Sequence, residues 1–173
     1  MGQLTEKQRA ALLSKINPAR VQMLRGMAHL EAWDVRRYLI RIFGHGGYDF
    51  EVLETALVHQ GEGEKKRNDG GTYPVYTVVY RVTGRLVIKD ESGFPIAHWD
   101  DGAAGDAINQ PSVGDAHDMA LKTAMSQAIK RCAVNLGDQF GLSLYDDGAT
   151  EPVVKWSLIP NPVNELEREE VAA

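Results

Sequence analysis

The first hydrophobic segment of the chain follows a helical period. Thr5 and Gln8 are spaced as a capping box, in which each side chain satisfies a backbone N–H of the first turn. Apolar residues then recur one helical turn apart as far as Ile16. Because Asn17-Pro18 favours a turn and proline cannot continue a helix, this pattern predicts a helix that ends at about Ile16.

A second helix is predicted after an irregular stretch. Residues 19–30 show no clear period and are interpreted as a loop or short turn. From Glu31 or Ala32, apolar residues recur at the spacing i, i+3, i+4, i+7, i+8 up to Phe43, which is typical of one buried helix face. Gly44 follows as a natural C-terminal stop.

The middle of the chain changes to a strand pattern. Residues 48–60 alternate in part, and residues 75–90 are rich in β-branched and aromatic side chains, which predicts two strands. The glycine-rich, charged residues 61–74 between them are interpreted as a long exposed hairpin loop. Gly84 indicates a bulge or bend, and residues 94–100 return as a shorter strand. We therefore expect an antiparallel meander of three or more strands.

A long helix closes the pattern. Residues 101–115 look like a loop, after which Asp115 is expected to cap a helix that runs to about Leu136. The predicted fold is α+β, with an antiparallel β-meander and the helices, the long one included, packed on one face of its sheet. We expect this domain to span residues 1–146 and an acidic, proline-containing C-terminal tail to span residues 147–173.

Composition narrows the classes of protein without deciding the function. A chain of 173 residues with 43% hydrophobic residues can bury one core, and a single cysteine excludes an internal disulfide framework or a thiolate metal site. No apolar run approaches the roughly 18 residues of a membrane span, so we expect no membrane contact and a cytoplasmic location. The net charge is −5, and residues 146–173 carry all of it, with seven acidic against two basic residues. A neutral body can still present a basic face.

The long helix carries the first candidate site. Its apolar residues fall within an arc of about 100°, and its opposite half carries hydroxyls, Lys122, Lys130 and Arg131. Along the chain no acid interrupts this half between Asp118 and Asp138, whereas a solvated helix face usually mixes the two signs of charge. Two interpretations stay open from these residues alone: a solvated face, or a face that contacts phosphates.

Two loops display further candidate residues. Three glycines within residues 44–47 require a tight path or the close approach of another chain, and His45 and Tyr48 lie beside them. Lys65 and Lys66 lie in the charged segment that we expect to be a mobile hairpin tip. Each set is either an ordinary surface turn or a contact for a phosphate backbone.

One strand carries three basic residues at a spacing of four. Arg81, Arg85 and Lys89 fall on one face of a strand because the spacing is even, unless Gly84 changes the register. Such a face is either a solvated sheet surface or a basic track for a phosphate backbone.

Signals for catalysis are weak. The "HWDD" segment (98–101), with Asp106, His117 and Asp118, leaves a metal-dependent nuclease as an alternative. The sequence has no HExxH motif, phosphate-binding loop or dinucleotide fingerprint, so we expect no enzyme, no bound metal and no cofactor. Cys132 lies on the apolar face of the long helix and is expected to be a core residue. An adaptor whose basic residues are incidental is the other alternative.

Four segments in this order resemble the N-terminal annealing domain of the Rad52 family, over roughly residues 5–146. They are the "NPARV" break, the helix ending "FGHGGYDFEV", the meander with "VIKDESG", and "ALKTAMSQAIKRCAVNLGDQFG". The family form of the last segment is a helix with a basic pair followed by a Phe-Gly motif. The small size of the chain suggests a bacterial or phage single-strand annealing protein.

The resemblance implies a β-β-β-α fold assembled as a homo-oligomeric ring, with single-stranded DNA in a basic groove. Such proteins anneal complementary strands in recombination and DNA repair without nucleotide hydrolysis. Lys130 and Arg131 match the basic pair of the family's inner DNA groove, and Lys122 matches a basic position on the same helix. Lys89 matches a lysine of the family's outer DNA site, and Arg85 lies beside it.

The chain departs from the family pattern at several positions. Asp34 stands where the family has a groove arginine, which leaves Arg36 or Arg37 as the substitute, and His45 stands where it has a tyrosine. The acidic tail would repel DNA. Because the tail also contains Trp156, we expect it to bind a partner such as a single-strand-binding protein.

Overall fold

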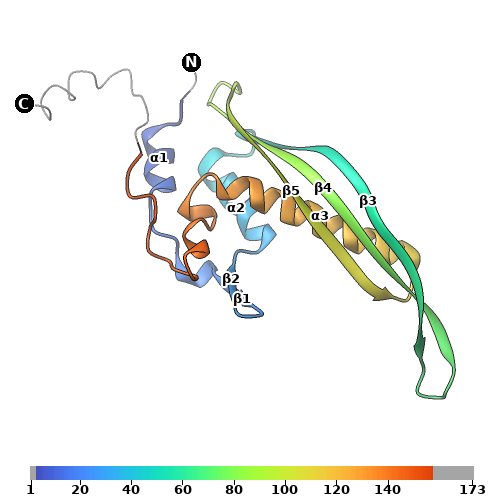
Figure 1. The fold of residues 1–173 in the computed structure, drawn as a ribbon. Coiled ribbons are helices and arrows are strands. Elements are labelled where there is room, and N and C mark those ends of the chain that lie inside the picture. Colours follow the sequence, from blue (N-terminus) through green and yellow to red (C-terminus); the bar gives the residue numbers. More distant parts are fainter. Residues whose placement is uncertain (1–2, 158–173) are drawn as a thin grey trace, which may run out of the picture.

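The predicted α+β class is confirmed by the computed structural model, which describes residues 3–157 (Figure 1). A three-stranded antiparallel sheet packs against a long helix, and two shorter helices and a small hairpin lie at one end. The elements are, in chain order, α1 (Glu6–Leu12), the 3-10 helix η1 (Pro18–Arg20), β1 (Gln22–Leu24), β2 (Met27–His29), α2 (Ala32–Phe43), β3 (Tyr48–Lys66), β4 (Thr72–Lys89), β5 (Pro95–Gln110), α3 (Val113–Val134), and the 3-10 helices η2 (Asp138–Phe140) and η3 (Ser143–Tyr145).

The packing of α3 on the sheet depends on small residues. Ala116, Ala120, Ala124 and Ala128, one helical turn apart, are fully buried against strands β4 and β5. A Cβ atom at Gly105 of β5 would lie 2.2 Å from the backbone nitrogen of Ala124, so only glycine fits where the helix crosses the strand. The buried stripe along the N-terminal half of α3 is therefore made of alanines. Leu121 and Met125, the larger apolar residues that the helical period assigned to this face, are only half-buried.

Two predicted loops are strands. Residues 61–66 and 72–74 continue β3 and β4, so the loop is confined to residues 67–71. Beyond Tyr76, which pairs with the last residue of β5, strands β3 and β4 continue alone as a two-stranded arm, residues 63–75. Apart from Val75 at its base, which is buried, and the partly buried Tyr73, the arm is exposed. Its sequence is therefore polar although its backbone is paired as in any hairpin. The same correction holds for residues 101–110, whose glycines and alanines suggested a loop but belong to β5.

The stretch before α2 also differs from the prediction. Instead of a loop, it forms η1 and a hairpin of β1 and β2 that reverses at Arg25 and Gly26, both with positive φ. The capping box at Thr5 is confirmed, although α1 ends at Leu12, and the N-cap of α3 is Ser112 rather than Asp115. The register of β3 shifts beside Gly84, as its position in the strand pattern indicated.

A buried ion pair ties the N-terminal elements together. The Nε atom of Arg20 donates to Asp34 Oδ2 at 2.8 Å, and its guanidinium also donates to the side chain and the carbonyl of Gln139. The same guanidinium lies 3.2 Å above the ring of Tyr38. Asp34, which stands where the family has a groove arginine, is therefore a structural residue that joins η1 and α2.

The start of the C-terminal segment lies against the body of the protein. Glu151 forms an ion pair with Lys15, and the backbone nitrogen of Val154 donates to Asp138 Oδ2 at 3.1 Å. Trp156 is 72% exposed. The glutamates at positions 165–170, which belong to the acidic tail expected to repel DNA, lie outside the described residues.

Candidate nucleic-acid interface

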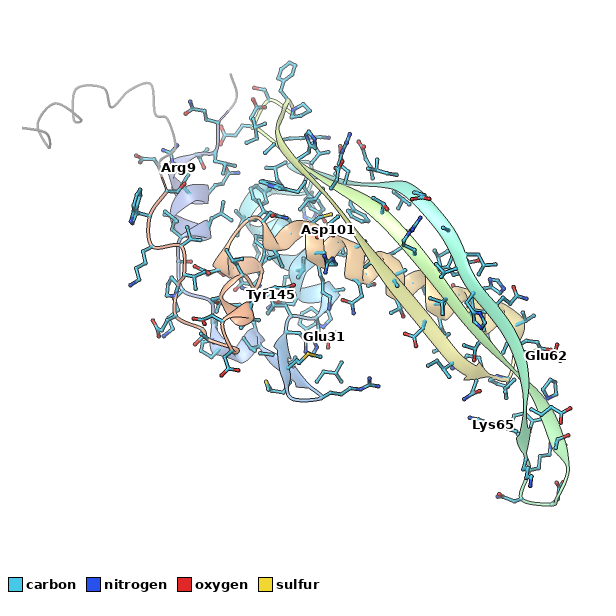
Figure 2. The ribbon with its side chains drawn as sticks, in the orientation of Figure 1. Arg9, Glu31, Glu62, Lys65, Asp101 and Tyr145 are labelled. Carbon is cyan, nitrogen blue, oxygen red and sulfur yellow. The ribbon has the colours of Figure 1, made fainter. Side chains whose placement is uncertain are left out.

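A groove separates the β1–β2 hairpin from the C-terminal half of α3. It has a volume of about 630 Å³ and is lined on the helix side by Gln127, Lys130 and Arg131. The hairpin side presents Met23 and Met27, which are 66% and 67% exposed. Tyr145, labelled in Figure 2, and Asp147 also line the groove. The helix wall is therefore cationic and the hairpin wall is mainly apolar. A cationic wall beside an apolar one suits a ligand with a charged backbone and flat apolar groups.

Lys130 is the cation of the groove that is most withdrawn from water. Its side chain is half-buried, and this burial lowers the pKa of its ammonium group, while the nearby carboxylate of Glu31 acts in the opposite direction. No described residue forms an ion pair with Lys130. A cation in this setting interacts more strongly with an arriving anion than a fully hydrated lysine does.

Arg131 lies beside it but is already engaged. Its Nε atom donates to Asp101 Oδ1 on β5 at 3.0 Å, and this hydrogen bond raises the pKa of the guanidinium. The side chain remains 51% exposed, so its other N–H groups can still reach an anion. The two members of the basic pair thus have different surroundings.

Lys122 does not belong to the groove. It lies two helical turns before Lys130, is 72% exposed, and pairs with Asp118 at 2.5 Å on the preceding turn. Each basic residue of this half of α3 therefore has a carboxylate nearby. Lys122 meets Asp118 of the same helix, Arg131 meets Asp101 of β5, and Lys130 is influenced by Glu31, which precedes α2.

The two candidate arginines of α2 also differ from each other. Arg37 forms an ion pair with the buried Asp34 and lies 5.0 Å from the ring of the exposed Trp33. Arg36 is exposed, and no ion pair joins it to another described residue. Of the two, Arg36 is the one whose charge is available to a ligand.

In the turn after α2, the side chains of His45 and Tyr48 have different surroundings. His45 is exposed, whereas Tyr48 is half-buried and packs against the main core. The glycines here have a local reason, because a Cβ atom at Gly47 would lie 1.9 Å from the carbonyl oxygen of Phe43. The tight path predicted from the glycines is confirmed, and it serves the reversal of the chain.

The three basic residues of β4 do share one face of the sheet, the face away from α3, but each is paired. Arg85 makes two hydrogen bonds of 2.7 Å to Asp100, which lies opposite it on β5. This interaction raises the pKa of the guanidinium and lowers that of the carboxyl group. The other two pairs are Arg81 with Glu54 at 3.1 Å and Lys89 with Asp49 at 2.5 Å. This face is therefore a surface of paired charges and not a continuous basic track.

Lys65 lies near the end of the arm, far from the groove (Figure 2), and Lys66 is the next and last residue of β3. Both are exposed, and neither forms an ion pair with a described residue. Their charges are accessible, but the structure does not bring them together with Lys130.

The family model of the Rad52/22 double-strand break repair proteins matches residues 1–161. The chain belongs to the Rad52/22 family. It is therefore a protein of DNA repair and recombination by single-strand annealing, and proteins of this family are annealing proteins rather than enzymes. A comparison with curated proteins found no match. The bacterial or phage source suggested by its size stays a prediction.

The arrangement of acids and histidines gives no support to the nuclease alternative. Asp100 and Asp101 point to opposite faces of the sheet, and the ring nitrogens of His117 lie 2.8 Å from the Tyr80 hydroxyl and 3.0 Å from Gln60 Oε1. Among residues 3–157, no group of three His, Cys, Asp or Glu side chains is placed to hold a metal ion. Within the same range, no helix is long and apolar enough to span a membrane.

The cysteine is a core residue, as predicted. Cys132 is fully buried, and its Sγ atom lies 3.4 Å from the carbonyl oxygen of Gly84. Burial raises the pKa of the thiol, which makes it less reactive as a nucleophile.

Sequence reasoning missed the apolar wall of the groove. Met23, Leu24 and Met27 belong to a hairpin that was interpreted as a loop. The signal was present, because the dipeptide Arg25-Gly26 between two short apolar runs is compatible with a two-residue turn. Glu31 was considered only as a helix start, and its effect on Lys130 depends on a tertiary contact.

Proposed function

We propose that this Rad52-family protein binds single-stranded DNA in the groove between the β1–β2 hairpin and α3, and anneals complementary strands as a homo-oligomeric ring. The observation that carries the proposal is the placement of Lys130 and Arg131 on one wall of a groove, opposite a hairpin that presents mainly apolar side chains. Phosphates would contact the two cations, and sugars and base faces would lie toward the hairpin.

This arrangement suits annealing because it reads no sequence. Contacts to phosphates fix the position of a strand without discriminating between bases. Base edges that are not bound by the protein remain available to a complementary strand. The reaction then needs no nucleotide hydrolysis, metal or cofactor, since pairing of the two strands supplies the free energy.

A ring explains how a chain with net charge −5 can hold DNA. Each subunit contributes few phosphate contacts, but a strand that passes from subunit to subunit binds many at once, and linked contacts raise the overall affinity far above that of one site. Electrostatic attraction between Lys or Arg and phosphates supplies the affinity, which is why binding should weaken steeply with salt.

Uncovered apolar surfaces support self-association. Helix α3 packs mainly on β4 and β5, and the outer edge of β3 pairs with no described strand. Leu57 and Val58 of β3 are 49% and 59% exposed. On the opposite side of the unit, Ile108 and Met119 are 57% and 46% exposed. Contact between two different surfaces of one chain is the kind that closes into a ring.

We rank the expected contribution of the remaining candidate residues to DNA binding by whether a carboxylate already pairs with each of them. The charges of Arg36, Lys65 and Lys66 are available to a DNA strand that passes outside the groove. The cations that are already paired must exchange a carboxylate for a phosphate, and we propose weaker contributions from them: Lys122, Arg37, Arg85 and Lys89. His45 can contribute a hydrogen bond, whereas Tyr48 contributes mainly to the core.

The test is a fluorescence annealing assay on Lys130→Ala/Arg131→Ala. We expect a folded and oligomeric double variant that no longer anneals complementary strands. The matched control is Arg9→Ala/Lys155→Ala, which removes the same charge from residues that do not line the groove. Annealing by the groove variant at the rate of the control variant would refute the assignment.

A further inference from the structure

A second hollow lies between α1 and α2, away from the groove. It has a volume of about 380 Å³, and its charged lining residues are Lys7, Lys15 and Arg41. None of the described residues that line it is acidic. A site with three cations and no carboxylate in its own wall is suited to an anionic ligand.

Two of these three cations have no counter-charge among the described residues. Lys15 forms an ion pair with Glu151, which reaches it from the C-terminal segment. Lys7 and Arg41 form no ion pair within residues 3–157, and the guanidinium of Arg41 lies 5.3 Å from the ring of Tyr38. The C-terminal segment therefore already supplies one carboxylate to this basic pocket and leaves two cations unmatched.

The chain brings more acid to the same place. The C-terminal segment is anchored at Glu151 and Val154, and in Figure 1 it runs alongside α1. The sequence beyond Ser157 contains four glutamates, Glu165, Glu167, Glu169 and Glu170. Seven residues lie between Ser157 and Glu165. Because an extended chain spans up to about 3.3–3.6 Å per residue, these glutamates are within reach of the pocket.

We propose that the acidic stretch from Glu165 to Glu170 docks on the pocket formed by Lys7, Lys15 and Arg41 of its own chain. Its carboxylates pair with Lys7 and Arg41 and so complete the neutralisation that Glu151 begins at Lys15. A single exposed ion pair contributes little. Several pairs formed by a tethered segment act together, because the tether keeps the local concentration of carboxylates high.

This docking has a consequence for the DNA groove. An acidic segment held beside α1 keeps its negative charge away from Lys130 and Arg131, which line a different hollow. Docked there, the segment also covers Lys7 and Arg41, whose charges otherwise attract anions outside the groove. The proposal concerns a different site from the groove and does not depend on the function proposed above.

The test is zero-length carbodiimide crosslinking of the full chain, followed by mass spectrometry. We expect Lys7 to form amide crosslinks with glutamates 165–170, and high salt to remove them. The Lys15–Glu151 contact serves as the internal positive control, and Lys65 and Lys66 on the remote arm serve as negative controls. A mixture of chains with and without ¹⁵N distinguishes crosslinks within one chain from those between chains.

Variants and competing ligands complete the test. A Glu→Gln exchange at positions 165, 167, 169 and 170 should abolish these crosslinks and leave the Lys15–Glu151 crosslink and the circular dichroism spectrum unchanged. Arg41→Gln should reduce the yield at Lys7, since it removes half of the unmatched charge. Lys130→Ala/Arg131→Ala should keep the crosslinks even if it loses DNA binding, so the two proposals fail independently.

Three results would overturn the proposal. Coupling of the tail glutamates to Lys65 and Lys66 as often as to Lys7 would show non-specific attraction. Crosslinks found only between differently labelled chains would assign the pocket to a neighbouring copy's tail. Protection of Lys7 from amine modification by single-stranded DNA, without any tail crosslink, would assign the pocket to nucleic acid.

Discussion

The basic residues of the groove and those of the outer sheet face carry the same charges in different surroundings. On the sheet, Arg85 faces Asp100 across one strand pair, and the two side chains satisfy each other. In the groove, Lys130 is half-buried and forms no ion pair with a described residue. Arg131 is intermediate, because Asp101 occupies one of its N–H groups. The availability of a cation for DNA therefore depends on which acids the fold places beside it.

Charge reversal should separate the two surfaces most strongly. Lys130→Glu places a carboxylate where a phosphate is expected, and repetition around a ring multiplies the effect, so we expect the DNA affinity to fall by at least about tenfold. Arg85→Glu should change the affinity much less, because the sheet face already carries paired charges. Fluorescence anisotropy with labelled single-stranded DNA measures both. Equal losses for the two variants would contradict the distinction between the surfaces.

Removal of the competing acids is expected to have a smaller effect of opposite sign. Asp101→Asn frees Arg131 for phosphate, and because an exposed ion pair is worth about 0.2–1 kcal/mol, we expect the DNA affinity to rise by a factor of about 1.4 to 5. Asp100→Asn frees Arg85 in the same way and is the matched control. If only Asp100→Asn raises the affinity, the DNA site lies on the sheet and the groove is not the site.

The pH dependence of binding should report on Lys130. Burial lowers its pKa below the 10.5 of an ordinary lysine, so its charge is lost at a lower pH, whereas Arg131 stays protonated because its own pKa is raised. DNA affinity should therefore decline at alkaline pH before exposed lysines titrate. Lys130→Arg should remove this decline, because the arginine remains charged. A decline that is identical in the variant and the wild type would place the titrating group elsewhere.

The smallest effect is expected from chelation of divalent metal. No group of acids and histidines in residues 3–157 is placed to hold a metal, so annealing in EDTA should proceed at the rate measured without it. Incubation of single-stranded DNA with the protein in magnesium should leave the strand intact, as followed on a denaturing gel. Metal-dependent cleavage that co-purifies with the protein and is abolished by Asp101→Asn would instead support a nuclease.

Errors in the sequence-based prediction of the fold have a common cause. Residues 101–110 were interpreted as a loop because they are rich in glycine and alanine. In the strand that they form, position 105 must be glycine because the backbone of α3 crosses directly over it. Residues 61–66 were interpreted as a loop because they are charged and glycine-rich. This composition is tolerated in a strand here because the strand is exposed to solvent. In each case the composition reflects what surrounds the strand, and a local pattern carries no information about a neighbour that is distant in sequence.

The sequence by itself determined the elements whose period and end signals are local. The helix from Ala32 to Phe43, the strand through residues 75–89 and the long helix were all predicted because alternation, helical period and a stop glycine act within a few residues. Sequence similarity also indicated the family, since four segments in a fixed order are a property of the chain alone. The candidate pair Lys130 and Arg131 was likewise identified from the sequence, through the helix face without acids and through the match to the family.

Only the tertiary structure decided which cations are free. Arg131 meets Asp101 from 30 positions away, and Arg85 meets Asp100 because strands β4 and β5 pair in one register. A shift of that register by one residue would move Asp100 to the other face of the sheet. The electrostatics of the surface follow from such alignments, which place charges within a few ångströms of each other regardless of their distance along the chain.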